Sequence, residues 1–124
     1  MYDISTSTEK RITTNSSTSD NPVIYGNKIV WTYNRNENND IYMYDISTSK
    51  EKRITSNSSD SVWPAIYGNK IVWMDNRNGD YYYDIYMYDI STSTEKRITT
   101  DGSNHQEPAI YGNTVLHQLD QRII

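Results

Sequence analysis

The segment DIYMYDISTS at residues 40–49 recurs unchanged at residues 84–93, and its second half opens the chain at Met1. Two further motifs keep the same spacing: RIT at 11–13, 53–55 and 97–99, and IYGN at 24–27, 66–69 and 110–113. Each series advances by 42 and then by 44 residues. A period of about 40–45 residues is the length of one four-stranded propeller blade, so the chain is predicted to be an all-β repeat protein.

One period contains four short segments with strand character. They are residues 64–67, 70–73, 84–89 and 95–99, and a Gly68-Asn69 turn of the kind that closes tight hairpins joins the first two. The second segment, KIVW, is continuous and bulky enough to be buried on both faces. The fourth is charged and follows a Ser/Thr turn, as suits an exposed outer edge strand.

The aromatic residues follow the strand pattern. In the third segment, alternation places Ile85 and Met87 on one face of the sheet and Tyr86 and Tyr88 on the other. Five other aromatic residues recur at fixed repeat positions and are expected to pack between blades: Tyr25, Tyr67, Tyr111, Trp31 and Trp73.

These motifs resemble the TolB-type β-propeller repeats that occur in tandem in archaeal surface-layer and cell-surface proteins, especially those of methanogens. The resemblance extends from Met1 to about Leu116 and rests on PAIYGN, IVW, NRN and DIYMYD. It implies a propeller of four-stranded antiparallel blades in an extracellular or cell-surface protein. Such propellers act as scaffolds of the envelope or as adhesion modules, and the resemblance says less about activity than about fold.

The repeat divides the chain into partial and complete blades. Residues 1–14 supply strands three and four of one blade, 15–56 and 57–100 are full blades, and 101–124 supply strands one and two with a degenerate tail. These are three blades' worth of strands, whereas closed propellers have about four to eight blades. We expect a homodimer that closes a six-bladed ring through two composite blades. The alternative is that the chain is a piece of a longer propeller.

Composition excludes several classes of partner. The net charge is −4, from 12 basic and 16 acidic residues interspersed along the repeats, so nucleic acid is not an expected partner. Cysteine is absent, which excludes disulfides and thiolate metal sites. No apolar run approaches the roughly 20 residues of a membrane-spanning helix, and no signal peptide is expected within this chain. No cofactor is predicted.

Catalytic chemistry is not expected either. The only histidines, His105 and His117, lie in the last repeat and have no equivalents in the others. His105 is predicted to be a solvated residue of a loop between blades, and His117 a substitution at the tryptophan position. Neither is accompanied by a nucleophile motif or a carboxylate pair, so the chain is predicted not to be an enzyme.

Two loop features are candidate sites. Asp75, Asn78 and Asp80 belong to an oxygen-rich loop that could suggest calcium, but the loop lacks the spacing of an EF-hand and contains Arg77. The structural alternative is that Asp75 pairs with Arg77 across a tight turn. The tyrosines at 81, 82 and 83 do not recur and lie on a lengthened loop, so they are candidates for stacking on a sugar or docking on a protein.

The function predicted from these features is a non-enzymatic structural or interaction module of the cell surface. The alternative is a carbohydrate- or peptide-binding propeller that uses its central opening or the loop of Tyr81, Tyr82 and Tyr83. A surface protein or a glycan is the expected kind of external partner. Two glycosylation sequons, at 15–17 and 57–59, agree with an extracellular origin.

Overall fold

Every regular element in the described part of the chain is a β-strand. The structure is a computed structural model, and it describes residues 1–13, 18–35, 38–56, 59–79 and 81–119. The strands are β1 (Tyr2–Asp3), β2 (Thr8–Glu9), β3 (Thr18–Tyr25), β4 (Lys28–Arg35), β5 (Asn38–Asp45), β6 (Lys50–Arg53), β7 (Ser61–Tyr67), β8 (Lys70–Asp75), β9 (Asp84–Asp89), β10 (Thr94–Arg97), β11 (His105–Tyr111) and β12 (Thr114–Leu119). None of the described residues forms a helix long and apolar enough to cross a membrane.

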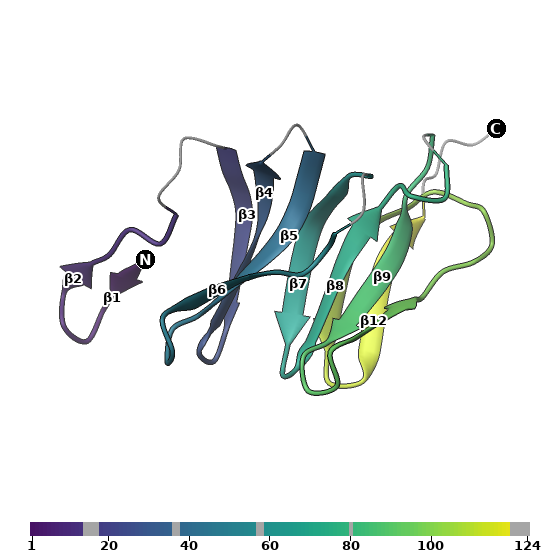
Figure 1. Cartoon of the computed structure of the whole chain (residues 1–124). Helices are drawn as coiled ribbons and strands as arrows, with labels where there is room; N and C mark the ends of the chain where they lie inside the picture. The colour runs from purple at the N-terminus through teal and green to yellow at the C-terminus, as the bar shows by residue number, and fades with distance from the viewer. Residues whose placement is uncertain (14–17, 36–37, 57–58, 80, 120–124) are drawn as a thin grey trace.

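The strands form antiparallel sheets in chain order. Strands β3–β6 make a four-stranded first sheet and β7–β10 a four-stranded second sheet, while β1–β2 and β11–β12 form an N-terminal and a C-terminal hairpin. These units follow one another from one end of the molecule to the other (Figure 1). Strands β3 and β11, the first strands of the first sheet and of the C-terminal hairpin, both lie against β7, the first strand of the second sheet. The prediction of an all-β chain with antiparallel sheets is confirmed.

Strands β3, β7 and β11 each contain a bulge that the sequence did not predict. The strand was expected to begin at Pro64, but β7 begins at Ser61 and its register shifts between Val62 and Ala65. Trp63, at the bulge, has a φ of 60°, and the same shift occurs in β3 and β11. Because proline has no amide hydrogen to offer a neighbouring strand, a bulge lets the strand continue past it. The freed Trp63 amide instead donates to Thr32 Oγ1 of the first sheet, at 3.2 Å.

The middle strands are buried on both faces. Ile71, Val72 and Trp73 are fully buried, as their continuous apolar sequence predicted. Side chains of β9 alternate between two apolar clusters: Tyr86 and Tyr88 pack with residues of the first sheet, whereas the Ile85 and Met87 side chains pack toward the C-terminal hairpin. The predicted division of β9 into two faces is confirmed.

The repeated tyrosines form a row across the units, as predicted for aromatic residues that pack between blades. The ring centroids of Tyr25 and Tyr67 are 4.8 Å apart, and those of Tyr67 and Tyr111 are 4.7 Å apart. Each tyrosine ends its strand next to a turn glycine with positive φ, such as Gly68 at 59°. The row therefore joins the first strands of three successive units.

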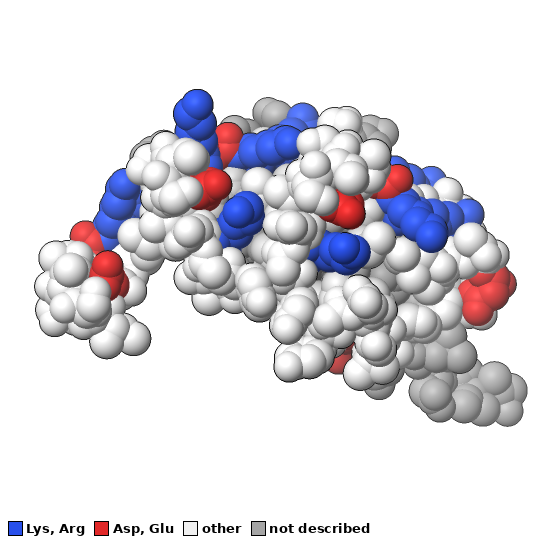
Figure 2. Space-filling view, turned by 90° about the horizontal axis from the view of Figure 1, so that it is seen from below, with Lys and Arg blue, Asp and Glu red and all other residues white. Residues whose placement is uncertain are grey.

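Charged side chains gather on the outermost strands. Strands β6 and β10 carry the sequences KEKR and TEKR, and nearly all of their residues are exposed. Figure 2 shows Lys and Arg side chains along the convex margin of the molecule, with few charged side chains on the concave margin. Charge on an edge strand discourages pairing with other chains, so these strands act as the outer edges that were predicted.

Two tryptophans of β7 and β8 provide a test of this packing. Trp73 is fully buried and Trp63 is half exposed. We expect Trp73→Ala to lower the free energy of unfolding by about 3–5 kcal/mol because it leaves a large cavity. Trp63→Ala should cost about 1 kcal/mol or less. Urea unfolding followed by circular dichroism measures both, and equal losses would contradict the described core.

Candidate functional site

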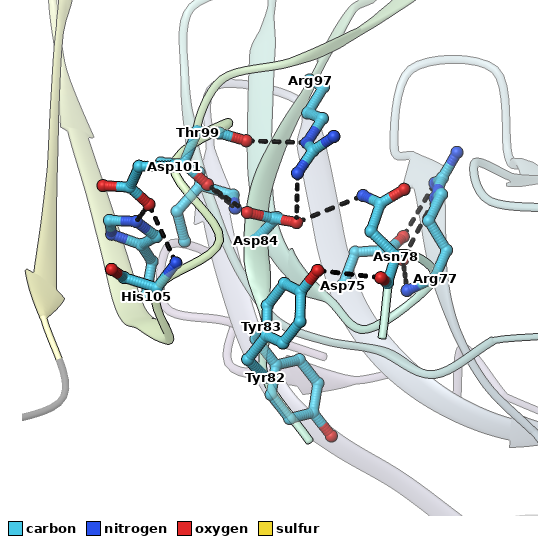
Figure 3. A network of polar contacts seen from close by, with 12 residues as sticks. Asp75, Arg77, Asn78, Tyr82, Tyr83, Asp84, Arg97, Thr99, Asp101 and His105 are labelled. Carbon is cyan, nitrogen blue, oxygen red and sulfur yellow. Dashed lines mark hydrogen bonds and ion pairs between the residues drawn. The ribbon is translucent and has the colours of Figure 1, made fainter. Parts of the chain in front are cut away.

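A buried aspartate at the start of β9 holds the ends of two strands together (Figure 3). Asp84 is fully buried, and its Oδ1 accepts a hydrogen bond from Thr99 Oγ1 at 2.8 Å. Its Oδ2 accepts from Arg97 Nη2 at 3.0 Å and from Asn78 Nδ2 at 3.2 Å. The Thr99 hydroxyl in turn accepts the amide hydrogen of Ile85 at 3.0 Å. We call Asp84, Arg97 and Thr99 the strand clamp.

The first sheet has the same clamp. Asp40 Oδ2 accepts from Arg53 Nη2 at 2.7 Å, and its Oδ1 accepts from Thr55 Oγ1 at 2.8 Å. The Ile41 amide donates to the Thr55 hydroxyl at 3.0 Å. Sequence reasoning used the RIT and DIYMYD motifs only as markers of the period and missed this contact. The signal was present, because an aspartate precedes the Arg of each RIT by the same number of residues in both sheets.

Asp75, at the end of β8, is fully buried and accepts hydrogen bonds on both oxygens. Oδ2 receives Arg77 Nη2 at 2.7 Å, Ser61 Oγ at 3.0 Å and Trp73 Nε1 at 3.1 Å. Oδ1 receives the Arg77 amide at 2.9 Å and Arg77 Nε at 3.1 Å. Burial disfavours the charge, but the hydrogen bonds from Arg77 and Trp73 outweigh it and lower the pKa of Asp75.

Arg77 is held from several sides at once. Its guanidinium pairs with Glu95 and Asp75 and lies 3.9 Å from the centroid of the Tyr86 ring. Burial disfavours its charge, yet the two carboxylates raise its pKa. The predicted pairing of Asp75 with Arg77 across a tight turn is thus present.

No metal was predicted, and the geometry gives no support to calcium at two of the three weak candidates, Asp75 and Asn78. A cation at Asp75 would have to displace Arg77 and the other donors, and the Asn78 amide nitrogen points to Asp84 and to the Tyr86 hydroxyl. Among the residues that the structure describes, no group of three or more His, Cys, Asp or Glu side chains could hold a metal ion. The third candidate, Asp80, lies outside the described residues, as do 15–17 and 57–58 of the two sequons.

The tyrosines at 81, 82 and 83 differ in exposure and in the contacts that they make. Tyr81 is 98% exposed. The Tyr82 hydroxyl donates to the Asn78 carbonyl oxygen at 2.8 Å, and its ring lies so close to Gly79 that a Cβ there would clash. Tyr83 packs against the apolar cluster of Ile85, and burial together with the charges of Asp60 and Asp75 raises its pKa. Of the three predicted contact residues, Tyr81 is the one that the loop leaves fully open.

The two histidines lie together, which corrects the prediction. His105 was expected to be solvated in a loop, but it is buried at the start of β11. Its Nε2 lies 2.7 Å from Asp101 Oδ1, and its Nδ1 lies 3.0 Å from Nδ1 of His117 on β12. The hydrogen bond from His105 lowers the pKa of Asp101, so the ionised carboxylate accepts the Nε2 hydrogen. His105 Nδ1 then accepts from His117 when both rings are neutral.

The histidine pair is a variant of the Asp75 site. By repeat position, His105 and His117 correspond to Ser61 and Trp73, both of which donate to Asp75 in the second sheet. The position of Asp75 is Leu119 in the C-terminal hairpin, so the carboxylate is supplied by Asp101 instead. Sequence reasoning treated the two histidines separately because they are twelve positions apart in the chain, and strand pairing brings them together.

The comparison with solved structures gives a TolB-like fold. The putative TolB from Agrobacterium tumefaciens matches with a TM-score of 0.64 and 24% identity over 78% of this chain and 35% of that one. TolB from Acinetobacter baumannii matches with a TM-score of 0.64 and 27% identity over 88% of this chain and 28% of that one. The tricorn protease matches with a TM-score of 0.60 and 22% identity over 73% of this chain and 9% of that one.

These likenesses confirm the predicted TolB-type propeller architecture at the level of the fold. The chain spans about a third of the length of the two TolB structures. No protein-family model matches the chain, and no curated protein sequence matches it. The predicted relation to surface-layer proteins therefore stays a prediction.

The strand clamp can be tested within one strand. We expect Asp84→Ala to lower the free energy of unfolding by about 2–3 kcal/mol, because Arg97 and Thr99 lose their buried acceptor. Asp89→Ala, at the other end of β9, is the matched control. Asp89 contacts an exposed Ser91 turn, so its loss should cost less than about 1 kcal/mol. Equal values in denaturant unfolding would contradict a clamp at Asp84.

The lowered pKa of Asp75 predicts a pH dependence. A carboxylate whose pKa is lower in the folded than in the unfolded state contributes stability above its unfolded pKa of about 3.9. That contribution is lost as the pH falls through the lowered folded pKa. We expect the stability difference between the wild type and Asp75→Asn to be largest near neutral pH and to narrow below about pH 4. Parallel stability curves between pH 7 and pH 2.5 would contradict this.

Proposed function

We propose that this chain is part of a non-catalytic interaction module of the cell surface. The observation that carries the proposal is that the buried carboxylates, which could otherwise act in catalysis, are engaged in structural contacts. Asp40 and Asp84 fasten strands, and Asp75 is saturated by donors from Arg77, Trp73 and Ser61. Because the buried carboxylates are used in this way, the protein is expected to bind a partner through its surface and not to contain an active centre.

The TolB-like fold supports an interaction role, since solved TolB structures are the neighbours of this chain. The tricorn protease is also a neighbour, but it shares 9% of its length with this chain and informs the fold alone. Among the described residues, the hydrogen-bonded series Asp101–His105–His117 is the arrangement that most resembles a catalytic site. It lacks a nucleophile within the contacts that its three members make.

Absence of catalysis is tested directly with chromogenic peptidase, esterase and glycosidase substrates. We expect turnover no higher than that of a His117→Ala variant or of buffer. Reproducible hydrolysis that the wild type supports and His117→Ala abolishes would contradict the proposal.

The surface location is supported by the likeness of the repeats to surface-layer propellers and by Ser/Thr/Asn-rich turns such as Ser91–Ser93. An antibody raised against the chain should label intact cells of the source organism. Labelling only after the cells are permeabilised would contradict a surface location.

A second candidate function is carbohydrate or peptide binding at Tyr81. This ring is 98% exposed on a loop whose neighbours Tyr82 and Tyr83 are fastened to the fold. An exposed aromatic ring on a fixed loop loses little side-chain entropy on binding, and it can stack on the apolar face of a sugar or dock against a protein.

The Tyr81 site is tested by single substitutions on a glycan array and a peptide pool. We expect Tyr81→Ala to weaken any binding by about tenfold or more while leaving the unfolding midpoint unchanged, because the ring makes no packing contact. Trp63→Ala, which removes another exposed aromatic ring, is the matched control and should retain binding. Binding that survives Tyr81→Ala would overturn this candidate.

A further inference from the structure

The flank of the first sheet is exposed where the same residues of later units are buried. Ile24 on β3 is 62% exposed, whereas its counterpart Ile66 on β7 is 9% exposed. Pro22 is exposed and Pro64 is buried at the same repeat position. The covering of β7 comes from the first sheet, whose strands β3, β4 and β5 lie against it. Among the described strands, none covers β3 in the way that β3, β4 and β5 cover β7.

The opposite flank, on the C-terminal hairpin, also exposes residues whose counterparts in earlier units are buried. Leu116 on β12 is 66% exposed, whereas Val72 at the same position of β8 is fully buried. Tyr111 ends the tyrosine row with an exposed ring. This flank presents the face that, in the first and second sheets, is covered by the following unit.

The N-terminal hairpin is exposed along its strand edge. Tyr2 on β1 is 59% exposed, while its counterpart Tyr44 on β5 is 7% exposed. Between this hairpin and the first sheet lies an apolar groove of about 310 Å³, lined by Met1, Ile12, Pro22, Ile29 and Trp31 among others. In the first and second sheets, the strands that correspond to β11 and β12 pair with the strands that correspond to this hairpin: β4 pairs with β5, and β8 pairs with β9.

We propose that the two flanks are the two sides of one interface, which forms between two copies of this chain. The C-terminal hairpin of one copy would lie beside the N-terminal hairpin of the other and complete a four-stranded sheet. A second copy fits both flanks, because each exposed residue named above is a counterpart of a residue that is buried in the contacts between successive units of the chain. This inference goes beyond the proposed function and does not depend on it.

We call the contact between the C-terminal hairpin of one copy and the N-terminal hairpin of the other the joint. Its strand register follows from the pairing of β8 with β9. In that pairing Lys70 opposes Asp89, Ile71 opposes Tyr88 and Val72 opposes Met87. Carried to the equivalent positions, Thr114 of one copy opposes Asp3 of the second copy, Val115 opposes Tyr2, and Leu116 opposes Met1. Strand β12 pairs with β11 along one edge, and this register uses its other edge.

A lysine–tyrosine series continues across the same joint. Lys10 Nζ donates to the Tyr44 hydroxyl at 3.2 Å, and Lys52 Nζ donates to the Tyr88 hydroxyl at 2.9 Å. Each contact joins the last strand of one unit to the third strand of the next. The next member of the series is Lys96, and the tyrosine at the required position is Tyr2 of the second copy. Both side chains are exposed in the single chain.

The tyrosine row predicts the third contact. Tyr25, Tyr67 and Tyr111 are spaced 4.8 and 4.7 Å apart by ring centroid. At the joint, Tyr111 of one copy would be followed by Tyr25 of the second copy, and the row would continue without interruption. Two copies with two such contacts would give four complete sheets and two composite sheets. That makes six blades, within the range of about four to eight at which propellers close.

Molar mass in solution tests the assembly. By light scattering after size exclusion, we expect the chain to have about twice its 14.5 kDa mass. A compact monomer at concentrations well above micromolar would overturn the proposal. A mass that grows without limit as concentration rises would overturn closure with two copies, because it indicates an open chain of joints.

A charge on the flank tests which surface is used. Leu116→Asp should raise the dissociation constant of the dimer at least about tenfold, because it places a charge in the joint. Tyr81→Asp introduces the same charge at a ring that is more exposed and belongs to neither flank, so it should leave the mass unchanged. A dimer that Leu116→Asp leaves intact would use another surface and would overturn the proposal.

Cysteine pairs test the register, since the chain has no cysteine of its own. Opposed residues of antiparallel strands have Cα atoms about 4.5–5.5 Å apart, within the range for a disulfide. Chains carrying Val115→Cys, refolded together with chains carrying Tyr2→Cys, should form a covalent dimer under mild oxidation. Each variant alone, and Tyr2→Cys mixed with Tyr81→Cys, should not. Equal cross-linking of the control mixture would overturn the register. A failed binding assay for Tyr81 would leave these results unaffected, so the two proposals fail independently.

Discussion

The fold depends on strands that are apolar on both faces. Ile71, Val72 and Trp73 succeed one another along β8 and are all fully buried, so the second sheet must have a neighbour on each side. Burying side chains of this size contributes about 1.5–3 kcal/mol each, and a sheet left alone would lose that contribution on one face. Stability is therefore a property of successive units in contact, as in other repeat proteins. The same requirement makes the exposed flanks at Ile24 and Leu116 the places where a further unit fits.

Because both faces of the middle strands pack against apolar side chains, the buried carboxylates lie at or near the ends of strands. Asp84 begins β9, and Asp40 lies two residues after the start of β5. Each receives the arginine that ends the following strand and a threonine two residues beyond it, while Asp75 ends β8 and receives Arg77. A buried charge is tolerated only when it is paired and hydrogen-bonded. These contacts fix where the outer strand ends and how the loop turns, which leaves Tyr81 as the open side chain of a fastened loop.

The units share one framework, and one position within it illustrates how they differ. The second sheet has Asp75 there, the first sheet has Tyr33, and the C-terminal hairpin has Leu119. Ser61 and Trp73 donate to Asp75. Their counterparts in the C-terminal hairpin, His105 and His117, contact each other, and Asp101 supplies the carboxylate. In the first sheet, which has Tyr33 in place of the carboxylate, the Nε1 of Trp31 is buried without a hydrogen-bond partner among the described residues. The framework therefore accepts different polar clusters at this position, including one in which the tryptophan loses its acceptor.

The sequence by itself determined the period, the strand segments and the faces of β9, because the motifs repeat and the apolar pattern is local. It also predicted the Asp75–Arg77 pair, which spans two residues. Tertiary structure decided the rest: the bulge at Trp63, the strand clamp across thirteen residues, the meeting of His105 with His117, and the separate roles of Tyr81, Tyr82 and Tyr83. These features depend on which strands become neighbours and on how much space a loop leaves. Neither the choice of neighbouring strands nor the space within a loop can be derived from the spacing of residues along the chain.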